Sequence, residues 1–183
     1  KAWNSYAMSA RVSSLHVWSP DLDSPTPVNS IHLEFAGVPG DRHYGKTMAT
    51  GAREKHAFDR GTEISNYRQI SIVDLHELTK IAANLGITDL APGTIADNIC
   101  TEGLPDLTAL PLMTRLMFPS GASIMTGGAN APCTIAGAMV ESVYGTKPHS
   151  FPKAAMHLRG ITGWVEKPGV INAGDEITVV TLN

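Results

Sequence analysis

The chain has 183 residues, of which 43% are hydrophobic and 17% are charged, and its formal net charge is −3. This length and composition support one sizeable core, and they predict a single domain over residues 1–183. A chain of this hydrophobicity is not expected to be disordered. The slight acidic excess argues against a basic nucleic-acid binder, so we expect no nucleic-acid partner.

The sequence also bears on membrane contact and on compartment. No segment approaches the roughly 18 consecutive apolar residues that a membrane-spanning helix needs, and residues 1–6 lack the apolar run of a signal peptide. The two cysteines, Cys100 and Cys133, are too few for a disulfide scaffold and are typical of a reducing compartment. We therefore expect a cytoplasmic protein with free thiols and no membrane partner.

Short segments with strand patterns occur along the whole chain. Ile31–Phe35 alternates apolar and polar residues, as a half-buried strand does. The turn residues Pro119–Gly121 lie between two apolar segments and predict a hairpin. The expected strands cover residues 11–18, 31–35, 69–73, 115–118, 122–126 and 177–182.

Two helices are predicted among these strands. The first follows Asp74, a good N-terminal cap, carries an apolar stripe from Leu75 to Leu85 and stops at Gly86. The second runs from about Thr134 to Tyr144, with Ile135, Met139, Val140 and Val143 at helical spacing and a terminating glycine. Many short strands with few helices favour a mainly β fold, a closed or nearly closed β-barrel with a few peripheral helices.

Residues 40–68 form a long stretch without periodicity and with a small excess of positive charge. Stretches of this kind are often functional, although a solvated surface loop is an equal alternative. Its first part, Gly40–Thr47, matches the phosphate-binding pattern GxxxxGKT. A nucleotide-binding module is therefore one hypothesis, and it requires a helix to begin at Lys46–Thr47.

The second predicted helix places a cysteine at its start. Cys133 follows Gly127–Pro132, a loop of small residues that allows a ligand to approach the backbone. Free N–H groups at a helix start stabilise a thiolate, which is a nucleophile and a ligand for soft metals. The alternative is a buried cysteine that acts as a small hydrophobic residue. No helix start follows Cys100, so we expect Cys100 to be such a core residue.

Several separated motifs together resemble the MOSC domain, the module named for the C-terminal part of molybdenum cofactor sulfurase. Each motif is short, but the ordered set is specific and covers about residues 30–180. The motifs are Gly40–Gly45, Arg68–Ser71, Gly93–Leu104, Pro132–Cys133, Arg159–Gly160 and Pro168–Asp175.

The resemblance implies a β-barrel whose pocket accepts the molybdenum cofactor (molybdopterin), with Cys133 as carrier of a transferable sulfur or as molybdenum ligand. It implies cofactor contacts from the matching residues Asp41, His43, Arg68, Asn98 and Arg159. Guanidinium groups such as those of Arg68 and Arg159 suit the phosphate of the pterin. Asp97 and Cys100 depart from the family pattern, which commonly has glutamate and leucine there.

The resemblance leaves two activities open beside nucleotide binding. One is a sulfur carrier or sulfurtransferase with a persulfide on Cys133. Its sulfur donor would be a separate protein, such as a pyridoxal-phosphate cysteine desulfurase, because this chain has no room for such a domain. The other is a molybdenum-dependent reductase of N-hydroxylated compounds, which would receive electrons from a separate reductase.

Overall fold

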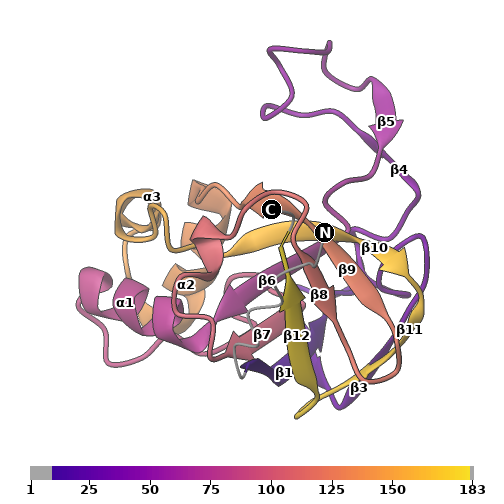
Figure 1. Ribbon diagram of the computed structural model, residues 1–183. Helices are drawn as coiled ribbons and strands as arrows, with labels where there is room; N and C mark the ends of the chain where they lie inside the picture. Colours follow the sequence, from indigo (N-terminus) through magenta and orange to yellow (C-terminus); the bar gives the residue numbers. More distant parts are fainter. Residues whose placement is uncertain (1–9, 182–183) are drawn as a thin grey trace.

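A computed structural model describes residues 10–181 of the chain. Its centre is a seven-stranded barrel in the order β12-β8-β9-β10-β6-β7-β1, closed by pairing of β1 with β12 (Figure 1). The barrel strands are β1 (Ala10–Val17), β6 (Ile70–Asp74), β7 (Ile99–Glu102), β8 (Arg115–Met117), β9 (Ser123–Ala129), β10 (Ile161–Lys167) and β12 (Glu176–Val180). The predicted mainly β barrel is confirmed.

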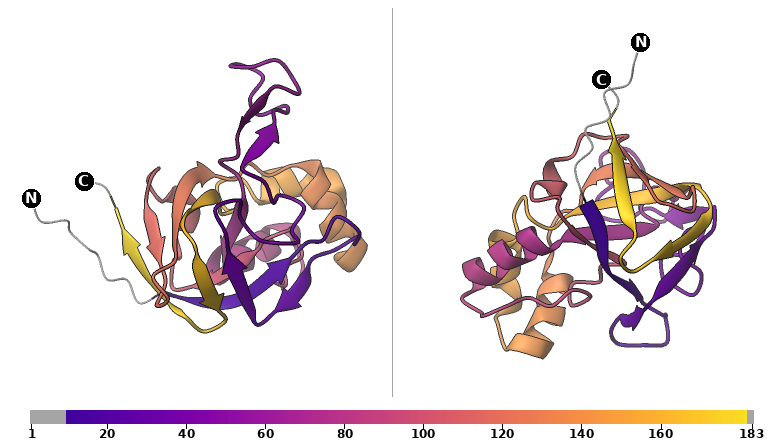
Figure 2. Two further views of the ribbon diagram at one scale, coloured as in Figure 1. Left: turned by 90° about the vertical axis from the view of Figure 1, so that its right-hand side faces the viewer. Right: turned by 60° about the horizontal axis from the view of Figure 1, so that its bottom comes forward.

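The other strands extend or decorate the barrel. Strand β2 (Thr26–Val28) continues the sheet beyond β1, and β3 (Ser30–Leu33) pairs with β11 (Gly169–Asn172). Strands β4 (Thr47–Ala49) and β5 (Glu63–Ser65) pair only with each other. Residues 47–65, here called the arm, project away from the barrel (Figure 1 and the left view of Figure 2).

The strands of the barrel bury the side chains that face its interior, and the helices cover one side of its outer surface. Along β12 buried and exposed residues alternate, whereas most of β6 is buried because helices pack on its outer side. One apolar cluster, including Leu15, Ile72 and Ile124, fills the barrel. A second cluster, including Ile81 and Val140, lies between the barrel wall and the helices.

The helices lie together beside the barrel (Figures 1 and 2). They are α1 (Leu75–Leu85), α2 (Thr134–Tyr144) and α3 (Phe151–Ala154), with short 3-10 turns η1 (Leu107–Ala109) and η2 (Pro148–Ser150). Helix α1 connects the parallel strands β6 and β7. Asp74 caps α1 by accepting a hydrogen bond from the His76 N–H (2.9 Å), and Gly86 ends it in the left-handed conformation.

The two predicted helices are confirmed, and the predicted hairpin corresponds to β8 and β9. One expectation needs correction, because the stretch 40–68, which shows no periodicity, contains the short strands β4 and β5. The apolar face of α2 is only partly buried. Val140 is fully buried, but Ile135 is 72% and Val143 63% exposed. Residues 1–6, for which no signal peptide is expected, lie outside the described residues. Leu182, the end of the last predicted strand, lies outside them as well.

Candidate functional site

Cys133 lies at the start of α2 and faces a cavity. It is the N-cap residue, with an extended backbone (φ −139°, ψ 166°), and its side chain makes no capping hydrogen bond. The thiol is free and partly exposed. It lines a cavity of about 380 Å³, here called the cysteine pocket, which extends from the N-terminus of α2 to residues Gly51–Glu54 of the arm. Its sulfur is therefore available to a ligand or a reagent.

Arg159 forms one wall of this pocket and has unused hydrogen-bonding capacity. The residue is 6% exposed, and its Nη2 donates to the Ile95 carbonyl (2.6 Å). Its Nε and Nη1 are buried without a hydrogen-bond partner. Burial lowers the pKa of Arg159 to about 10, and attraction to Asp97 and Cys133 opposes that effect. Buried unpaired donors are costly, so this guanidinium is suited to an anionic ligand.

Two further arginines line the same pocket. Arg68 has a buried Nε without a partner, and its Nη1 is 3.9 Å from a carboxylate oxygen of Glu54. Arg53 is held at the pocket by Asn130 and Ala131, whose oxygens accept its hydrogen bonds at 3.0 and 2.9 Å. Burial and repulsion from Arg68 lower the pKa of Arg53. The pocket thus gathers three cations against one acidic side chain, Glu54.

The carboxylate of Glu54 accepts hydrogen bonds from neighbouring protein groups. Its carboxylate accepts hydrogen bonds from the Tyr67 hydroxyl (2.6 Å) and the Gly51 N–H (2.8 Å). The Tyr67 bond is the main reason why its pKa is lowered. Because this carboxylate is already hydrogen-bonded twice and only distantly paired with Arg68, the pocket stays electropositive.

The backbone at Gly160 sets the position of Arg159. Gly160 has φ +77°, and a Cβ there would lie 1.9 Å from the Ile72 carbonyl oxygen of β6. Its N–H donates to the Thr108 hydroxyl, and its carbonyl accepts from the Asn130 N–H. The absence of a side chain therefore lets the chain pass directly against β6, which fixes Arg159 beside the cysteine pocket.

Of the residues implied by the family resemblance, Cys133, Arg68, Arg159 and His43 line the pocket, whereas Asp41 and Asn98 do not. Asp41 accepts hydrogen bonds from the Asn98 side chain and from the backbone of Trp18 and His43. Burial alone would raise the pKa of Asp41, but the His43 and Trp18 bonds outweigh it and the pKa is lowered. Asp41, supported by Asn98, thus positions the pocket residues Trp18 and His43 without lining the pocket itself.

Sequence reasoning missed Arg53 and Asn130 as a pair, as well as Trp18 and Met139, which also line the pocket. The positive excess of residues 40–68 was the available signal for Arg53. Nothing local in the sequence indicates that Arg53 contacts Asn130, because the two lie 77 positions apart.

The phosphate-loop interpretation of Gly40–Thr47 is wrong. Strand β4, and not a helix, begins at Thr47. The N-terminal helix dipole that this motif needs is therefore missing from the segment. The Gly45 carbonyl accepts a hydrogen bond from the Asn66 side chain (3.0 Å), so the segment packs as part of the fold.

Two features are absent from residues 10–181. No group of three or more His, Cys, Asp or Glu side chains could together hold a metal ion within this range. No helix of the described part of the chain is long and apolar enough to cross a membrane.

Comparisons with known proteins identify the family of the chain. The family model of the MOSC domain matches residues 41–178. A Bacillus subtilis protein named for metal-sulfur cluster biosynthesis, YuaD, is 38% identical over 175 residues, which is 94% of this chain and 91% of that protein.

Solved structures show the same fold. The crystal structure of Bacillus subtilis YuaD has a TM-score of 0.93 and 36% identity, and all of each chain is covered. YiiM from Geobacillus stearothermophilus has a TM-score of 0.66 at 15% identity, with 94% of this chain and 75% of that chain covered. The chain belongs to the MOSC domain family.

Proposed function

We propose that this protein carries sulfur as a persulfide on Cys133, beside a bound molybdenum cofactor. The observation that carries the proposal is the free, partly exposed Cys133 thiol at the start of α2, in a pocket with Arg53, Arg68 and Arg159. A persulfide is anionic at neutral pH, and guanidinium groups and the helix start favour an anion there. The name of YuaD, which refers to metal–sulfur clusters, supports sulfur chemistry in this branch of the family.

The residues present fit the cofactor. Molybdopterin is sulfur-rich and carries a phosphate, and the unpaired Nε and Nη1 of Arg159 and Nε of Arg68 are donors for such a group. The cofactor would be held by these two arginines and Arg53, with His43 at the pocket edge. When bound, it supplies a sulfur-ligated molybdenum centre. Asp41 and Asn98 would act indirectly, by positioning His43 and Trp18.

Sulfur transfer to Cys133 needs no group beyond a persulfide donor. The Cys133 thiolate attacks the outer sulfur of the donor persulfide, the donor's sulfur–sulfur bond breaks, and the donor cysteine leaves as a thiolate. Arg159 would stabilise the new persulfide anion. We expect the donor to be a separate protein, such as a pyridoxal-phosphate cysteine desulfurase, and the reaction to occur in the cytoplasm, where thiols stay reduced.

A second candidate rests on the position of Cys133 in the same pocket. The free thiol faces a volume of about 380 Å³, which leaves room for an organic phosphate group beside it, so the thiolate could bind the metal of the cofactor directly. In this alternative Cys133 is a permanent molybdenum ligand, and the protein reduces N-hydroxylated compounds with electrons from a separate reductase. Thiolate suits molybdenum because the metal favours sulfur ligands.

Mass spectrometry after incubation with a cysteine desulfurase and cysteine tests the first candidate. Wild type and the control variant Cys100→Ala should gain the mass of one sulfur atom, and Cys133→Ala should not. The absence of this gain, under conditions that load a known acceptor, refutes sulfur carriage. Molybdenum and pterin that copurify from a cofactor-competent host in wild type, but not in Cys133→Ala, support the second candidate instead.

A further inference from the structure

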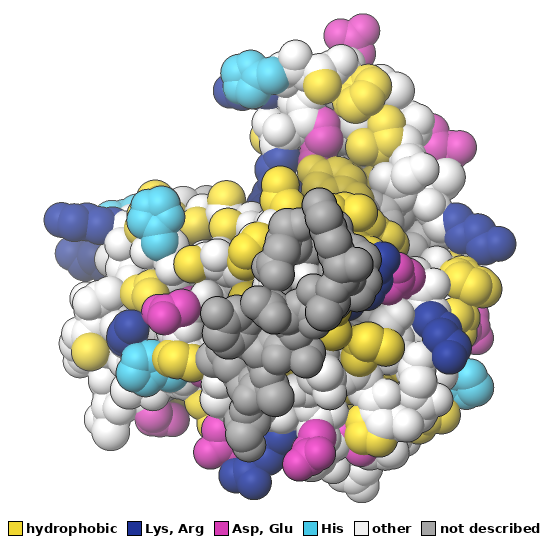
Figure 3. Space-filling view, in the orientation of Figure 1, with side chains coloured by type: hydrophobic (Ala, Val, Ile, Leu, Met, Phe, Trp, Pro, Cys, Tyr) yellow, Lys and Arg dark blue, Asp and Glu magenta, His cyan; other side chains and the backbone are white. Residues whose placement is uncertain are grey.

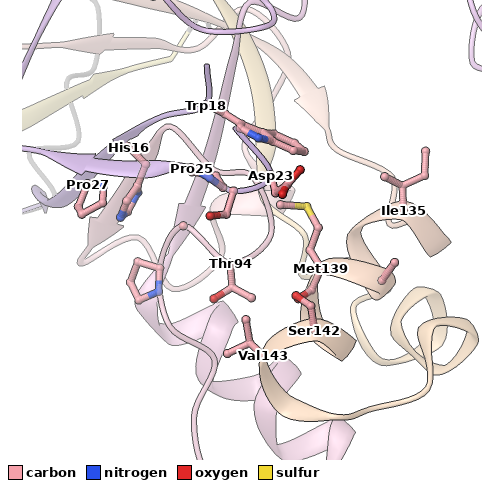
Figure 4. Close-up of a pocket in the computed structure, with 14 residues that line it drawn as sticks. His16, Trp18, Asp23, Pro25, Pro27, Thr94, Ile135, Met139, Ser142 and Val143 are labelled. Carbon is pink, nitrogen blue, oxygen red and sulfur yellow. The ribbon is translucent and has the colours of Figure 1, made fainter. Parts of the chain in front are cut away.

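A second cavity adjoins the cysteine pocket. It has a volume of about 650 Å³ and lies between α2, the chain that follows β1 and the turn at Pro92–Thr94 (Figure 4). We call it the α2 groove. Trp18, Ile135 and Met139 line both cavities, so the two are neighbours across these three side chains. A ligand in the α2 groove would therefore lie next to the space that Cys133 faces.

The walls of the α2 groove are mainly apolar. Ile135, Met139 and Val143 line the groove from α2, and Met139 extends toward Trp18 (Figure 4). Ile135 and Val143 are 72% and 63% exposed, so this face of α2 is not covered by the described part of the chain. Ligand pockets of this size commonly combine apolar and aromatic walls with a few polar groups.

Trp18 offers an aromatic surface with one side already occupied. The Arg42 guanidinium lies 3.4 Å from the centre of its ring. The Trp18 indole N–H donates to the Leu22 carbonyl, which fixes the ring orientation. Across the groove, the Met139 sulfur points toward Trp18 (Figure 4). A flat apolar or aromatic group that lies against the indole and the thioether gains favourable contacts with both.

The charge of the groove is opposite to that of the cysteine pocket. Asp23 lines the groove and is exposed, and its carboxylate lies between Trp18 and Met139 (Figure 4). His16, at the far end, is the other titratable residue of the lining. No lysine or arginine among residues 10–181 lines the groove, whereas three arginines line the cysteine pocket.

From these observations we propose that the α2 groove binds a flat, apolar organic group that carries a basic nitrogen, with the nitrogen at Asp23. The α2 face and Trp18 hold the body of this ligand, and the shared residues direct its other end toward Cys133. Binding of this ligand in the α2 groove does not depend on a reaction at Cys133. The further claim that the groove is the substrate site rests on the proposed function, because it requires reactive chemistry at Cys133.

Benzamidine, a flat ring with a cationic amidine, is the probe, and benzoate has the same ring with the opposite charge. Ligand-observed NMR should show benzamidine binding to wild type and to Cys133→Ser, and binding of benzoate that is weaker by at least about tenfold. Val143→Lys, which adds bulk and positive charge inside the groove, should abolish benzamidine binding. Asp23→Asn should weaken it several-fold.

The matched control is Val170→Lys, because Val170 is a partly exposed valine on β11 that does not line the groove. It should bind benzamidine as wild type does. Equal binding of benzamidine and benzoate, or unchanged binding in Val143→Lys, overturns the proposal. A wild-type dimer in sedimentation velocity that dissociates in Val143→Lys would also overturn it, because a second copy would then cover the groove.

A separate experiment tests whether a ligand in the α2 groove places its other end near Cys133. A benzamidine that carries a chloroacetamide group should alkylate Cys133 at least about tenfold faster than chloroacetamide alone, because bound reagent is held near the thiol. Val143→Lys should lose this advantage while Val170→Lys keeps it. Equal rates for the two reagents refute the connection. Loss of persulfide formation with retained benzamidine binding would refute the proposed function but not this site.

Discussion

The environments of the two thiols predict very different reactivity. Cys100 has no exposed surface, and burial raises its pKa well above the ordinary value, so it reacts only when the barrel opens. For a domain with about 5 kcal/mol of stability, the open population is about one molecule in several thousand. Cys133 is partly exposed at the pocket and reacts in the native state. We expect Cys133 to alkylate at least about a thousandfold faster than Cys100.

The assay is timed labelling with iodoacetamide at pH 7, followed by digestion and mass spectrometry of the two cysteine peptides. Cys133→Ser should leave only the slow phase, and guanidinium chloride should make the two rates similar. Equal, slow labelling in the native protein would refute the reasoning. It would place Cys133 in the core, and both the persulfide and the molybdenum-ligand roles would have to be withdrawn.

Three further predictions concern stability, measured by urea unfolding. Asp74→Ala removes a helix cap and two other buried hydrogen bonds, so it should cost about 3 kcal/mol, whereas Asp106→Ala, which removes no capping bond, should cost little. Gly160→Ala should destabilise by at least about 2 kcal/mol more than Gly61→Ala, because both have positive φ but only Gly160 meets backbone; equal losses would contradict this. Above pH 8.5, where the thiol ionises only in the unfolded chain, wild type should lose about 1.4 kcal/mol per pH unit more than Cys100→Ala, and parallel pH profiles would refute this.

Local signals explain which parts of the fold were predictable. The caps Asp74 and Gly86 indicated the limits of α1, and alternation identified β3, whereas the turn residues Gly174 and Asp175 indicated the start of β12. Strand β7 was missed because its first three residues are all buried and do not alternate. Strand β10 was missed because Gly163 interrupts it, and that glycine is needed where a Cβ would lie 2.6 Å from the Met125 carbonyl oxygen.

The candidate site was less predictable, because it depends on long-range contacts. The small-residue loop and the helix that follows it placed Cys133 at a helix start, as the structure also does. The hydrogen bond of Arg53 with Asn130 joins residues 77 positions apart, and no local pattern encodes such a contact. The apolar spacing of Ile135 and Val143 helped to predict helix α2, yet these side chains line a cavity. Periodicity shows that a face is apolar, but not what covers it.

The space-filling view shows the arm standing clear of the body, with an indentation between them (Figure 3). Its tip includes Phe58, which is 46% exposed. The Arg53 hydrogen bonds to Asn130 and Ala131 link the base of the arm to the loop before α2. Arg53 is therefore both a wall of the cysteine pocket and a connection between the arm and the barrel.

The closure of the barrel has a consequence for folding kinetics. Strands β1 and β12 meet through two paired positions, Ala10 with Ile177 and Arg11 with Glu176, and through two backbone bonds between Val12 and the turn at Gly174–Asp175. These partners lie at opposite ends of the described chain, so this contact carries a large loop-closure entropy cost when it forms. The seam should therefore close late in folding and exchange its amide hydrogens earlier than β6, which is hydrogen-bonded on both sides by β7 and β10.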